Sequence, residues 1–260
     1  MSDAVQSRSA SVGVVVACHN EAPYLPRSLS ALTSSLSGLS RRILVVADRC
    51  TDQSVAIARG FAEVKLKQVS GWKNSYAENL NIGFTTLIQC DFIAIVDADM
   101  VVPANFFDRA IAALGMDTLA NSVSSALLTE PSSAYNSLYH SYEITMEGLG
   151  LNKRARKHGQ RVFRGSAVRQ LYREQGRVFS DAPNPDSMLD RETGWKVGVM
   201  GDVVVWSIRR TSLRRSMVGQ MRQGRAQRLM DARLSSLLTE FLRFRPIVPL
   251  SFILSGSSVD

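Results

Sequence analysis

The sequence predicts an α/β fold with a Rossmann-like, mostly parallel central sheet flanked by helices. Three short apolar runs are bounded by polar residues: Val12–Cys18, Ile43–Ala47 and Phe92–Val96. Strands buried on both faces of a parallel sheet have this pattern. The segments between the runs place apolar residues at helical spacing, for example at Leu25, Leu29 and Leu32. Alternating strands and helices predict a doubly wound sheet, in which ligands bind beyond the carboxyl ends of the strands.

The second part of the chain is less regular. Helices are expected over 103–114, 136–151, 166–175 and 211–230, and strands over 119–128 and 203–206. A basic loop is expected over 152–164, and a polar loop that begins a helix over 181–190. The predicted organisation is a flexible start (1–11), one domain (12–232, with halves 12–103 and 104–232) and a C-terminal helix with an apolar and basic tail (233–260).

Charge is unevenly distributed along the 260 residues. Residues 1–150 hold 10 Lys and Arg against 14 Asp and Glu, a net charge of −4, whereas residues 151–260 carry +12. A basic surface attracts nucleic acid, anionic lipid or phosphate-bearing substrates. No apolar run reaches the ~20 residues of a spanning helix. The start lacks a signal-peptide pattern and the cysteines number three, so a cytoplasmic protein is expected.

Acidic side chains follow each of the three apolar runs. Glu21 follows the first, Asp48 and Asp52 the second, and Asp97 and Asp99 the third. Carboxylates gathered at one edge of a sheet repel one another unless a cation or hydrogen-bond donors hold them. A hard divalent cation binds few carboxylates and completes its shell with diphosphate oxygens and water. The sequence therefore predicts a metal and diphosphate site here, with helix capping as the other interpretation of Asp52.

Four segments carry a resemblance to a known family. In order they are VVVACHNEAPYLPRSLSAL, ILVVADRCTDQSVAIAR, KNSYAENLNIG and FIAIVDADMVVP, which span residues 12–103. Together they resemble the inverting family-2 glycosyltransferases of the GT-A fold. The resemblance implies a nucleotide-diphosphate sugar as donor and Mn²⁺ or Mg²⁺ as cofactor. It continues more loosely to about residue 230.

The resemblance also implies roles for individual residues on the donor side. The segment around Ala17, Asn20 and Glu21 would line the nucleotide pocket, with Glu21 near the ribose or base. Asp48 would accept a hydrogen bond from the base, and Lys73 would lie near the base and diphosphate. Asn79 would also lie near the base and diphosphate, or else bond locally within its helix. Asp97 would contact the ribose or the metal, and Asp99 would bind the metal and bridge to the diphosphate.

The catalytic base of such enzymes lies shortly before a Gly-aromatic-Lys segment. Here that segment is Gly194-Trp195-Lys196, and Asp186 is the preferred base, followed by Asp190 and Asp181. The family's Glu-Asp pair appears as Pro185-Asp186 at a shorter spacing. Asp190 has a second interpretation, as a helix cap or the partner of Arg191. A base that removes the acceptor proton accelerates transfer by about 100- to 10,000-fold.

The resemblance implies that basic residues act on the diphosphate and the acceptor. Arg222 and Arg225 lie where many relatives carry Gln-x-x-Arg-Trp, and either they contact the diphosphate or they form a solvated helix face. Arg164 would belong to the acceptor wall. Trp206-Ser207 lies where many relatives carry a metal-binding His. The metal is then expected to rest on Asp99, the substrate and water.

The expected acceptor is a saccharide or a polyprenyl phosphate. The tail over 241–250 mixes bulky apolar residues with Arg, which suits peripheral contact with an anionic membrane, contact with a second subunit in a homodimer, or docking on the sheet. One alternative is a sugar-phosphate nucleotidyltransferase, but the segment after the first run lacks a Gly-rich basic loop. The other is a basic protein that binds nucleic acid or a membrane surface, although no motif of a sequence-specific reader is present.

Overall fold

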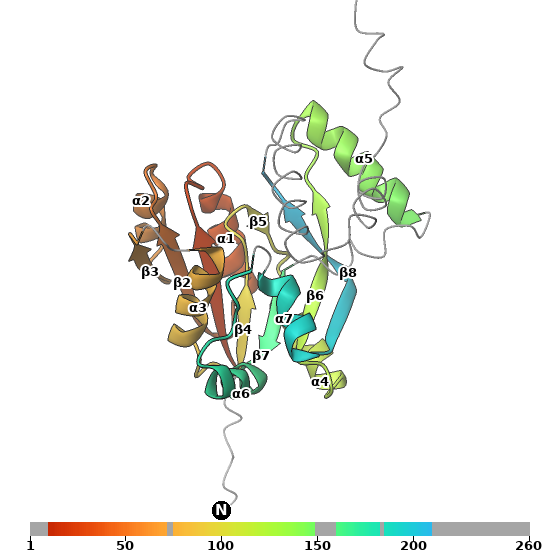
Figure 1. Cartoon of the computed structure of the whole chain (residues 1–260). Helices are drawn as coiled ribbons and strands as arrows, with labels where there is room; N and C mark the ends of the chain where they lie inside the picture. Colours follow the sequence, from red (N-terminus) through yellow and green to blue (C-terminus); the bar gives the residue numbers. More distant parts are fainter. Residues whose placement is uncertain (1–9, 72–74, 149–159, 183–184, 210–260) are drawn as a thin grey trace, which may run out of the picture. The chain divides into compact units, whose positions relative to one another are not determined.

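The computed structural model describes residues 10–71, 75–148, 160–182 and 185–209 (Figure 1). Within these ranges the strands form one eight-stranded sheet in the order β3-β2-β1-β4-β7-β6-β8-β5. The strands are β1 (Ser11–Cys18), β2 (Ser40–Asp48), β3 (Val64–Val69), β4 (Phe92–Ile95), β5 (Met100–Val101), β6 (Ser122–Thr129), β7 (Arg161–Arg164) and β8 (Val197–Ser207). The helices are α1 (Leu25–Ser35), α2 (Ser54–Arg59), α3 (Tyr76–Thr86), α4 (Phe106–Met116), α5 (Ala134–Gly148), α6 (Gly165–Gln175) and α7 (Pro185–Thr193).

The sheet confirms the predicted α/β class. Strands β3, β2, β1 and β4 run parallel, and β6 runs parallel to β8. Strand β7 is antiparallel to both of its neighbours, and β5 is antiparallel to β8. The register pairs Cys18 with Ala47 and Val15 with Ile95. The residues that follow β1, β2 and β4 therefore emerge along one edge of the sheet, as expected for a doubly wound fold.

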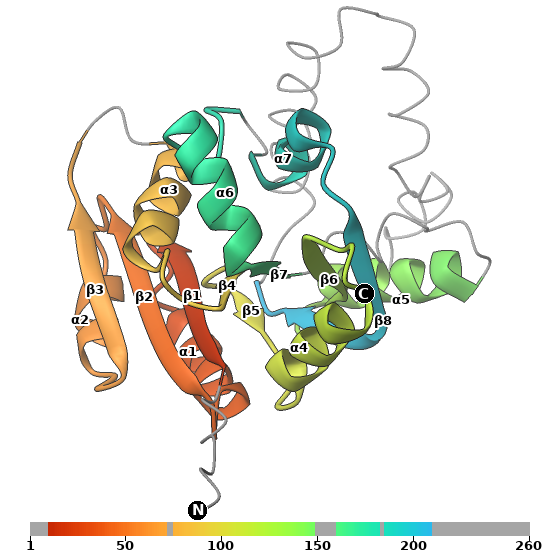
Figure 2. The same cartoon turned by 90° about the horizontal axis from the view of Figure 1, so that it is seen from below.

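Helices cover both faces of the sheet, as Figure 2 shows, with α1, α2 and α4 on one face and α3, α6 and α7 on the other. Val14 of β1 packs in the first layer and Val15 in the second, and both are fully buried. This two-sided burial explains the continuous apolar runs. Helix α3 approaches β1 so closely that a Cβ added at Gly83 would lie 2.3 Å from Val15 Cγ1. Only glycine fits there.

Several strands differ from the sequence-based expectation. Residues 161–164 were assigned to a basic loop, and that assignment is wrong because they form β7, which pairs with β4 and β6. The expected strand over 203–206 is the end of the eleven-residue β8, whose pairing with β6 is interrupted by an irregularity after Ser125. Edge strand β3 was not predicted, since only half of its residues contact the core.

The helices expected over 103–114, 136–151 and 166–175 correspond to α4, α5 and α6. The expected helix over 211–230 and the tail over 241–250 lie outside the described residues. Among the helices that the structure describes, none is long and apolar enough to cross a membrane.

Candidate functional site

The loops after β1 and β2 are tied together at the edge of the sheet. Nδ1 of His19 lies 2.6 Å from the carbonyl oxygen of Asp48, and Oδ1 of Asn20 accepts a hydrogen bond of 2.7 Å from the amide of Thr51. Asn20 and Arg49 adopt φ angles of 55° and 46°, a left-handed conformation that is uncommon outside glycine. Such strained residues cluster at functional sites. Both lie in the segments assigned to the nucleotide pocket.

Asp48 ends β2 as a buried carboxylate. Arg49 binds it through two hydrogen bonds, from Nε at 2.7 Å and from Nη2 at 2.8 Å. The Arg49 guanidinium lowers the pKa of Asp48, and a hydrogen bond from the Asn79 side chain acts in the same direction. Oδ1 of Asn79 is buried and has no hydrogen-bond partner among the described residues. Asp48 is therefore an ionised acceptor, and Asn79 supports it from α3.

Asp52 lies two residues before α2, whose N-cap is Gln53, and its carboxylate binds backbone amides on both sides of the loop. Its Oδ1 accepts a hydrogen bond of 2.9 Å from the amide of Ser54, and its Oδ2 accepts one of 3.0 Å from the amide of Ala22. Ser54 Oγ in turn accepts a hydrogen bond of 2.8 Å from the amide of Glu21. These bonds hold the backbone before Glu21 in place. Ala17, which was also assigned to the nucleotide pocket, pairs with Val46 of β2 near the end of β1.

Asp97 lies just beyond β4 and binds side chains from two other elements. The Tyr76 hydroxyl donates to its Oδ1 at 3.0 Å, and Nε2 of Gln160 donates to its Oδ2 at 3.3 Å. Burial raises the pKa of Asp97 to about 6, and the charges of Asp99 and Asp186 add to the shift. These three carboxylates are therefore close enough to influence one another. A cation at this edge would relieve their repulsion.

Asp99 and Glu21 share one cation, Arg209. Nε of Arg209 donates to Asp99 Oδ2 at 2.5 Å, and its Nη2 binds Glu21 Oε1. The carboxylate side chains of Glu21 and Asp99 are only 13% and 11% exposed. Burial raises the pKa of Glu21, although Arg209 opposes the shift. The structure thus brings the acids after β1 and β4 together on one guanidinium.

The carboxylate oxygens at this edge are of the type that a divalent cation binds. Oε2 of Glu21 is buried and has no hydrogen-bond partner among the described residues. Within the same residues, no three of His, Cys, Asp and Glu gather closely enough to hold a metal ion by themselves. A cation here would be held by Asp99 with Glu21 or Asp97, and its remaining ligands would come from the substrate and water.

Helix α7 presents two acids that have different partners. Asp190 is bound by Arg161, with Nη2 at 2.7 Å from Oδ1 and Nη1 at 3.3 Å from Oδ2. The expected pairing of Asp190 with Arg191 is therefore wrong. The Arg161 side chain is only 6% exposed, so Asp190 balances a buried charge. Within the described ranges the carboxylate of Asp186 has no hydrogen-bond or ion-pair partner. Asp181 is exposed in the preceding loop.

Arg164 does not lie at this edge. It pairs with Phe92 at the start of β4, whereas Asp97 lies beyond the end of that strand. Its guanidinium donates to the carbonyl oxygens of Ala120 at 2.6 Å and Asp117 at 2.9 Å. Arg164 thus anchors the chain after α4 at the opposite end of the sheet. Lys73, Arg222 and Arg225 lie outside the described residues.

Sequence reasoning missed four residues that organise the edge of the sheet: Tyr76, Gln160, Arg161 and Arg209. Tyr76 directly follows the N-cap Ser75 of α3, and Gln160 and Arg161 fall where a loop was expected. Arg209 lies two residues after the end of β8, close to Trp206-Ser207, the position at which the resemblance implied a metal-binding His and this sequence has none. The one sequence feature that could have indicated Arg209 is its position shortly after a predicted strand, where site residues are expected in this type of fold.

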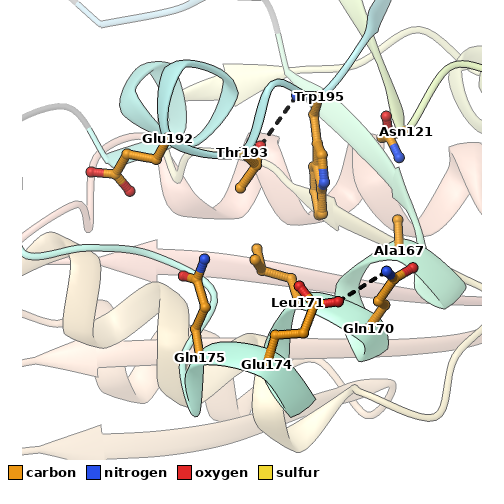
Figure 3. Close-up of a pocket in the computed structure, with 9 residues that line it drawn as sticks. All are labelled: Asn121, Ala167, Gln170, Leu171, Glu174, Gln175, Glu192, Thr193 and Trp195. Carbon is orange, nitrogen blue, oxygen red and sulfur yellow. Dashed lines mark hydrogen bonds between the residues drawn. The ribbon is translucent and has the colours of Figure 1, made fainter.

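A separate pocket of about 380 Å³ lies between α6 and the connection from α7 to β8 (Figure 3). Trp195 and Thr193 line one side, and Leu171 and Gln170 line the other. Asn121, which also lines it, precedes β6 at the end of the sheet where Arg164 lies. This pocket is therefore distinct from the acidic edge formed by Glu21, Asp97 and Asp99.

Comparison with solved structures identifies similar folds. TarS 1–349 of S. aureus in complex with UDP-GlcNAc has a TM-score of 0.58 at 14% identity, covering 79% of this chain and 60% of that one. A mannosyltransferase from Pyrobaculum calidifontis in complex with GDP-Man and Mn²⁺ has a TM-score of 0.58 at 19% identity, covering 93% and 66%. Glucosyl-3-phosphoglycerate synthase from Mycobacterium tuberculosis, in complex with Mn²⁺, UDP and phosphoglyceric acid, has a TM-score of 0.55 at 14% identity, covering 83% and 75%.

The chain therefore spans about three fifths of the length of TarS 1–349. No curated protein matches the sequence. Residues 13–173, more than half of the chain, match the family described as Glycosyl transferase family 2. This range includes Glu21, Asp48, Asp97 and Asp99 and the strands that they end or follow. By sequence and by fold, the chain belongs to glycosyl transferase family 2.

Proposed function

We propose that this protein transfers a sugar from a UDP- or GDP-sugar to an acceptor hydroxyl, with inversion and with the help of Mn²⁺ or Mg²⁺. The observation that carries the proposal is the edge where Glu21, Asp97 and Asp99 converge from two neighbouring strands. Solved proteins of similar fold hold UDP-GlcNAc, or GDP-Man with Mn²⁺, which supports this class of donor.

Each group at the edge has a role in this proposal. Asp48, ionised and held by Arg49, accepts a hydrogen bond from the base. Asp99 with Glu21 or Asp97 holds the divalent cation. When bound, the cation supplies positive charge to the departing diphosphate, whose negative charge grows as the glycosidic bond breaks. These residues orient the donor so that its anomeric carbon faces the acceptor.

Asp186 supplies the base. It lies in the first turn of α7, and its charge acts on Asp97, so it is near the donor side of the edge. Asp190 is less suited because Arg161 occupies both of its oxygens. In an inverting reaction Asp186 removes the hydroxyl proton as the acceptor oxygen attacks in line. A phosphate acceptor, which the +12 charge of residues 151–260 would attract, is already ionised and needs no base.

A donor screen tests the proposal directly. Thermal unfolding would be followed with UDP-, GDP- and dTDP-sugars, each with and without Mn²⁺. We expect one UDP- or GDP-sugar to raise the unfolding temperature, more strongly with Mn²⁺ than without it. NMR of the anomeric proton in the transfer product then reports inversion or retention. If no nucleotide sugar stabilises the protein under either condition, the proposed donor class is wrong.

A further inference from the structure

Arg209 is held in a defined position beside the acidic edge. It directly follows Ile208, whose amide donates a hydrogen bond of 3.0 Å to the carbonyl oxygen of Asp99. Nδ2 of Asn136 donates to the carbonyl oxygen of Arg209 at 3.0 Å. The backbone on both sides of this side chain is thus anchored. The backbone of Arg209 is therefore fixed by hydrogen bonds beside the acidic edge, which places its guanidinium next to Asp99 and Glu21.

The Arg209 guanidinium occupies oxygen atoms that a metal ion would need. Its Nε binds Oδ2 of Asp99 at 2.5 Å and its Nη2 binds Glu21, while its Cζ lies 5.4 Å from the ring centroid of Tyr24. A cation that used Asp99 Oδ2 would have to displace Nε from that oxygen. A guanidinium left in place would also repel the incoming cation. Arg209 and a divalent cation are therefore alternative partners of the same carboxylates.

We propose that Arg209 competes with the divalent cation for Asp99 and Glu21, and that the nucleotide diphosphate removes this competition. The inference rests on the proposed function, because it takes a nucleotide diphosphate as the ligand. The diphosphate offers oxygen ligands to the metal and an anionic partner to the displaced guanidinium. Metal and nucleotide then bind cooperatively, and each raises the affinity of the other by the same factor. Arg209 is in this way a positioning residue that makes metal binding depend on the donor.

The test measures Mn²⁺ binding without any activity assay. Electron paramagnetic resonance of free Mn²⁺ gives the dissociation constant of the wild-type protein and of Arg209→Gln, without nucleotide and with saturating UDP or GDP. We expect Arg209→Gln to bind Mn²⁺ alone at least about tenfold more tightly than the wild type. The gain in Mn²⁺ affinity on adding nucleotide should be smaller in the variant. An equal or weaker affinity of the variant for Mn²⁺ alone overturns the proposal.

Arg27→Gln is the matched control. Arg27 forms a two-point ion pair with Glu130 at 2.6 and 2.7 Å, binds neither Asp99 nor Glu21 within the described residues, and its loss changes the net charge by the same amount. We expect its Mn²⁺ affinity to stay within about twofold of the wild type. If Arg27→Gln tightens Mn²⁺ binding as much as Arg209→Gln does, the effect is general electrostatics and the competition is refuted.

Arg209→Lys covers the case in which Arg209→Gln fails to fold. Lysine keeps the charge but cannot bridge two carboxylates with a planar fork, so it should bind Mn²⁺ alone with an affinity between those of the wild type and Gln. A Lys variant with wild-type affinity and wild-type coupling overturns the inference. The outcomes also separate the two proposals. If the wild-type protein binds nucleotide equally well with and without Mn²⁺, both the inference and the metal dependence of the proposed function are refuted. If nucleotide binding depends on Mn²⁺ but the Arg209 variants leave this dependence unchanged, only the inference is refuted.

Discussion

The donor and acceptor sides of the acidic edge are built differently. On the donor side, the carboxylates end or closely follow strands of the parallel sheet, so the sheet itself places Asp48, Asp97 and Asp99. On the acceptor side, Asp190 lies on α7 and is held by Arg161, 29 residues away. The donor side also has long-range partners, such as Arg209, which binds Glu21 from 188 residues away. The positions of the donor-side carboxylates are therefore a property of the fold, whereas the arginines that bind Asp190 and Glu21 depend on particular long-range pairs.

The largest expected effect tests the donor side. Asp99→Asn should lower transfer by at least about 1,000-fold, because it removes the charge that holds the metal and leaves the departing diphosphate less stabilised. Isothermal titration should show that donor binding no longer responds to Mn²⁺. Asp202→Asn is the control, since Asp202 is an exposed acid of β8 that pairs with Arg109 and lies outside the site. Unchanged Mn²⁺ dependence in Asp99→Asn would remove Asp99 from the metal site.

The second prediction concerns the acceptor side. Asp186→Asn should reduce turnover by at least about 100-fold while donor binding is retained, if the acceptor is a hydroxyl. The measurements are single-turnover transfer and titration with the nucleotide. A loss below about tenfold would contradict the role of Asp186 as base and favour a phosphate acceptor or another carboxylate.

Asp190→Asn distinguishes a base from a structural partner. It should weaken the ion pair of Asp190 with the buried Arg161, and should therefore lower the free energy of unfolding by roughly 1–3 kcal/mol. Urea unfolding of the two variants makes the comparison, since Asp186→Asn should unfold like the wild type. The reverse pattern, with Asp186→Asn destabilised and Asp190→Asn inactive but stable, would exchange the two roles.

The same contrast explains how much of the structure could be predicted from the sequence. The apolar runs and the carboxylates that follow them predict β1, β2 and β4 and their shared edge, because the carboxyl ends of parallel strands meet there. Local pattern could not predict that Arg209 would reach Glu21, since that contact depends on how β8 joins the sheet. The resemblance placed Arg164 at the acceptor wall, but Arg164 ends β7, which runs antiparallel to β4, and so lies at the opposite end of the sheet.

The fourth prediction sharpens the donor side. Asp48→Ala should weaken binding of the nucleotide by about 1.5–3 kcal/mol, the range for a hydrogen bond that involves a charged group. Calorimetry with UDP and GDP measures it. Because Arg49 binds Asp48 through both oxygens, Arg49→Gln is the control that removes this ion pair and keeps the acceptor. Equal losses in the two variants would assign the effect to the ion pair and not to contact with the base.

The last prediction concerns Glu143 of α5, which binds the end of β6 and none of the acids of the edge, and no change in transfer is expected. Glu143 is 8% exposed and accepts hydrogen bonds from the amide of Thr129 at 2.8 Å and from its hydroxyl at 3.3 Å. Burial raises the pKa of Glu143 to about 7, so the folded state favours the protonated carboxyl. The stability that this proton provides is present below the unfolded pKa of about 4.5 and is lost as the pH rises through about 7. Glu143→Gln, which is always neutral, should therefore become more stable relative to the wild type between pH 5 and pH 8, by roughly 1–3 kcal/mol.

Thermal unfolding across that pH range measures the difference, with the exposed Glu174→Gln as control. A constant difference between Glu143→Gln and the wild type from pH 5 to pH 8 would show that Glu143 is ionised in the folded protein throughout, and that its two hydrogen bonds with Thr129 outweigh the cost of burying its charge.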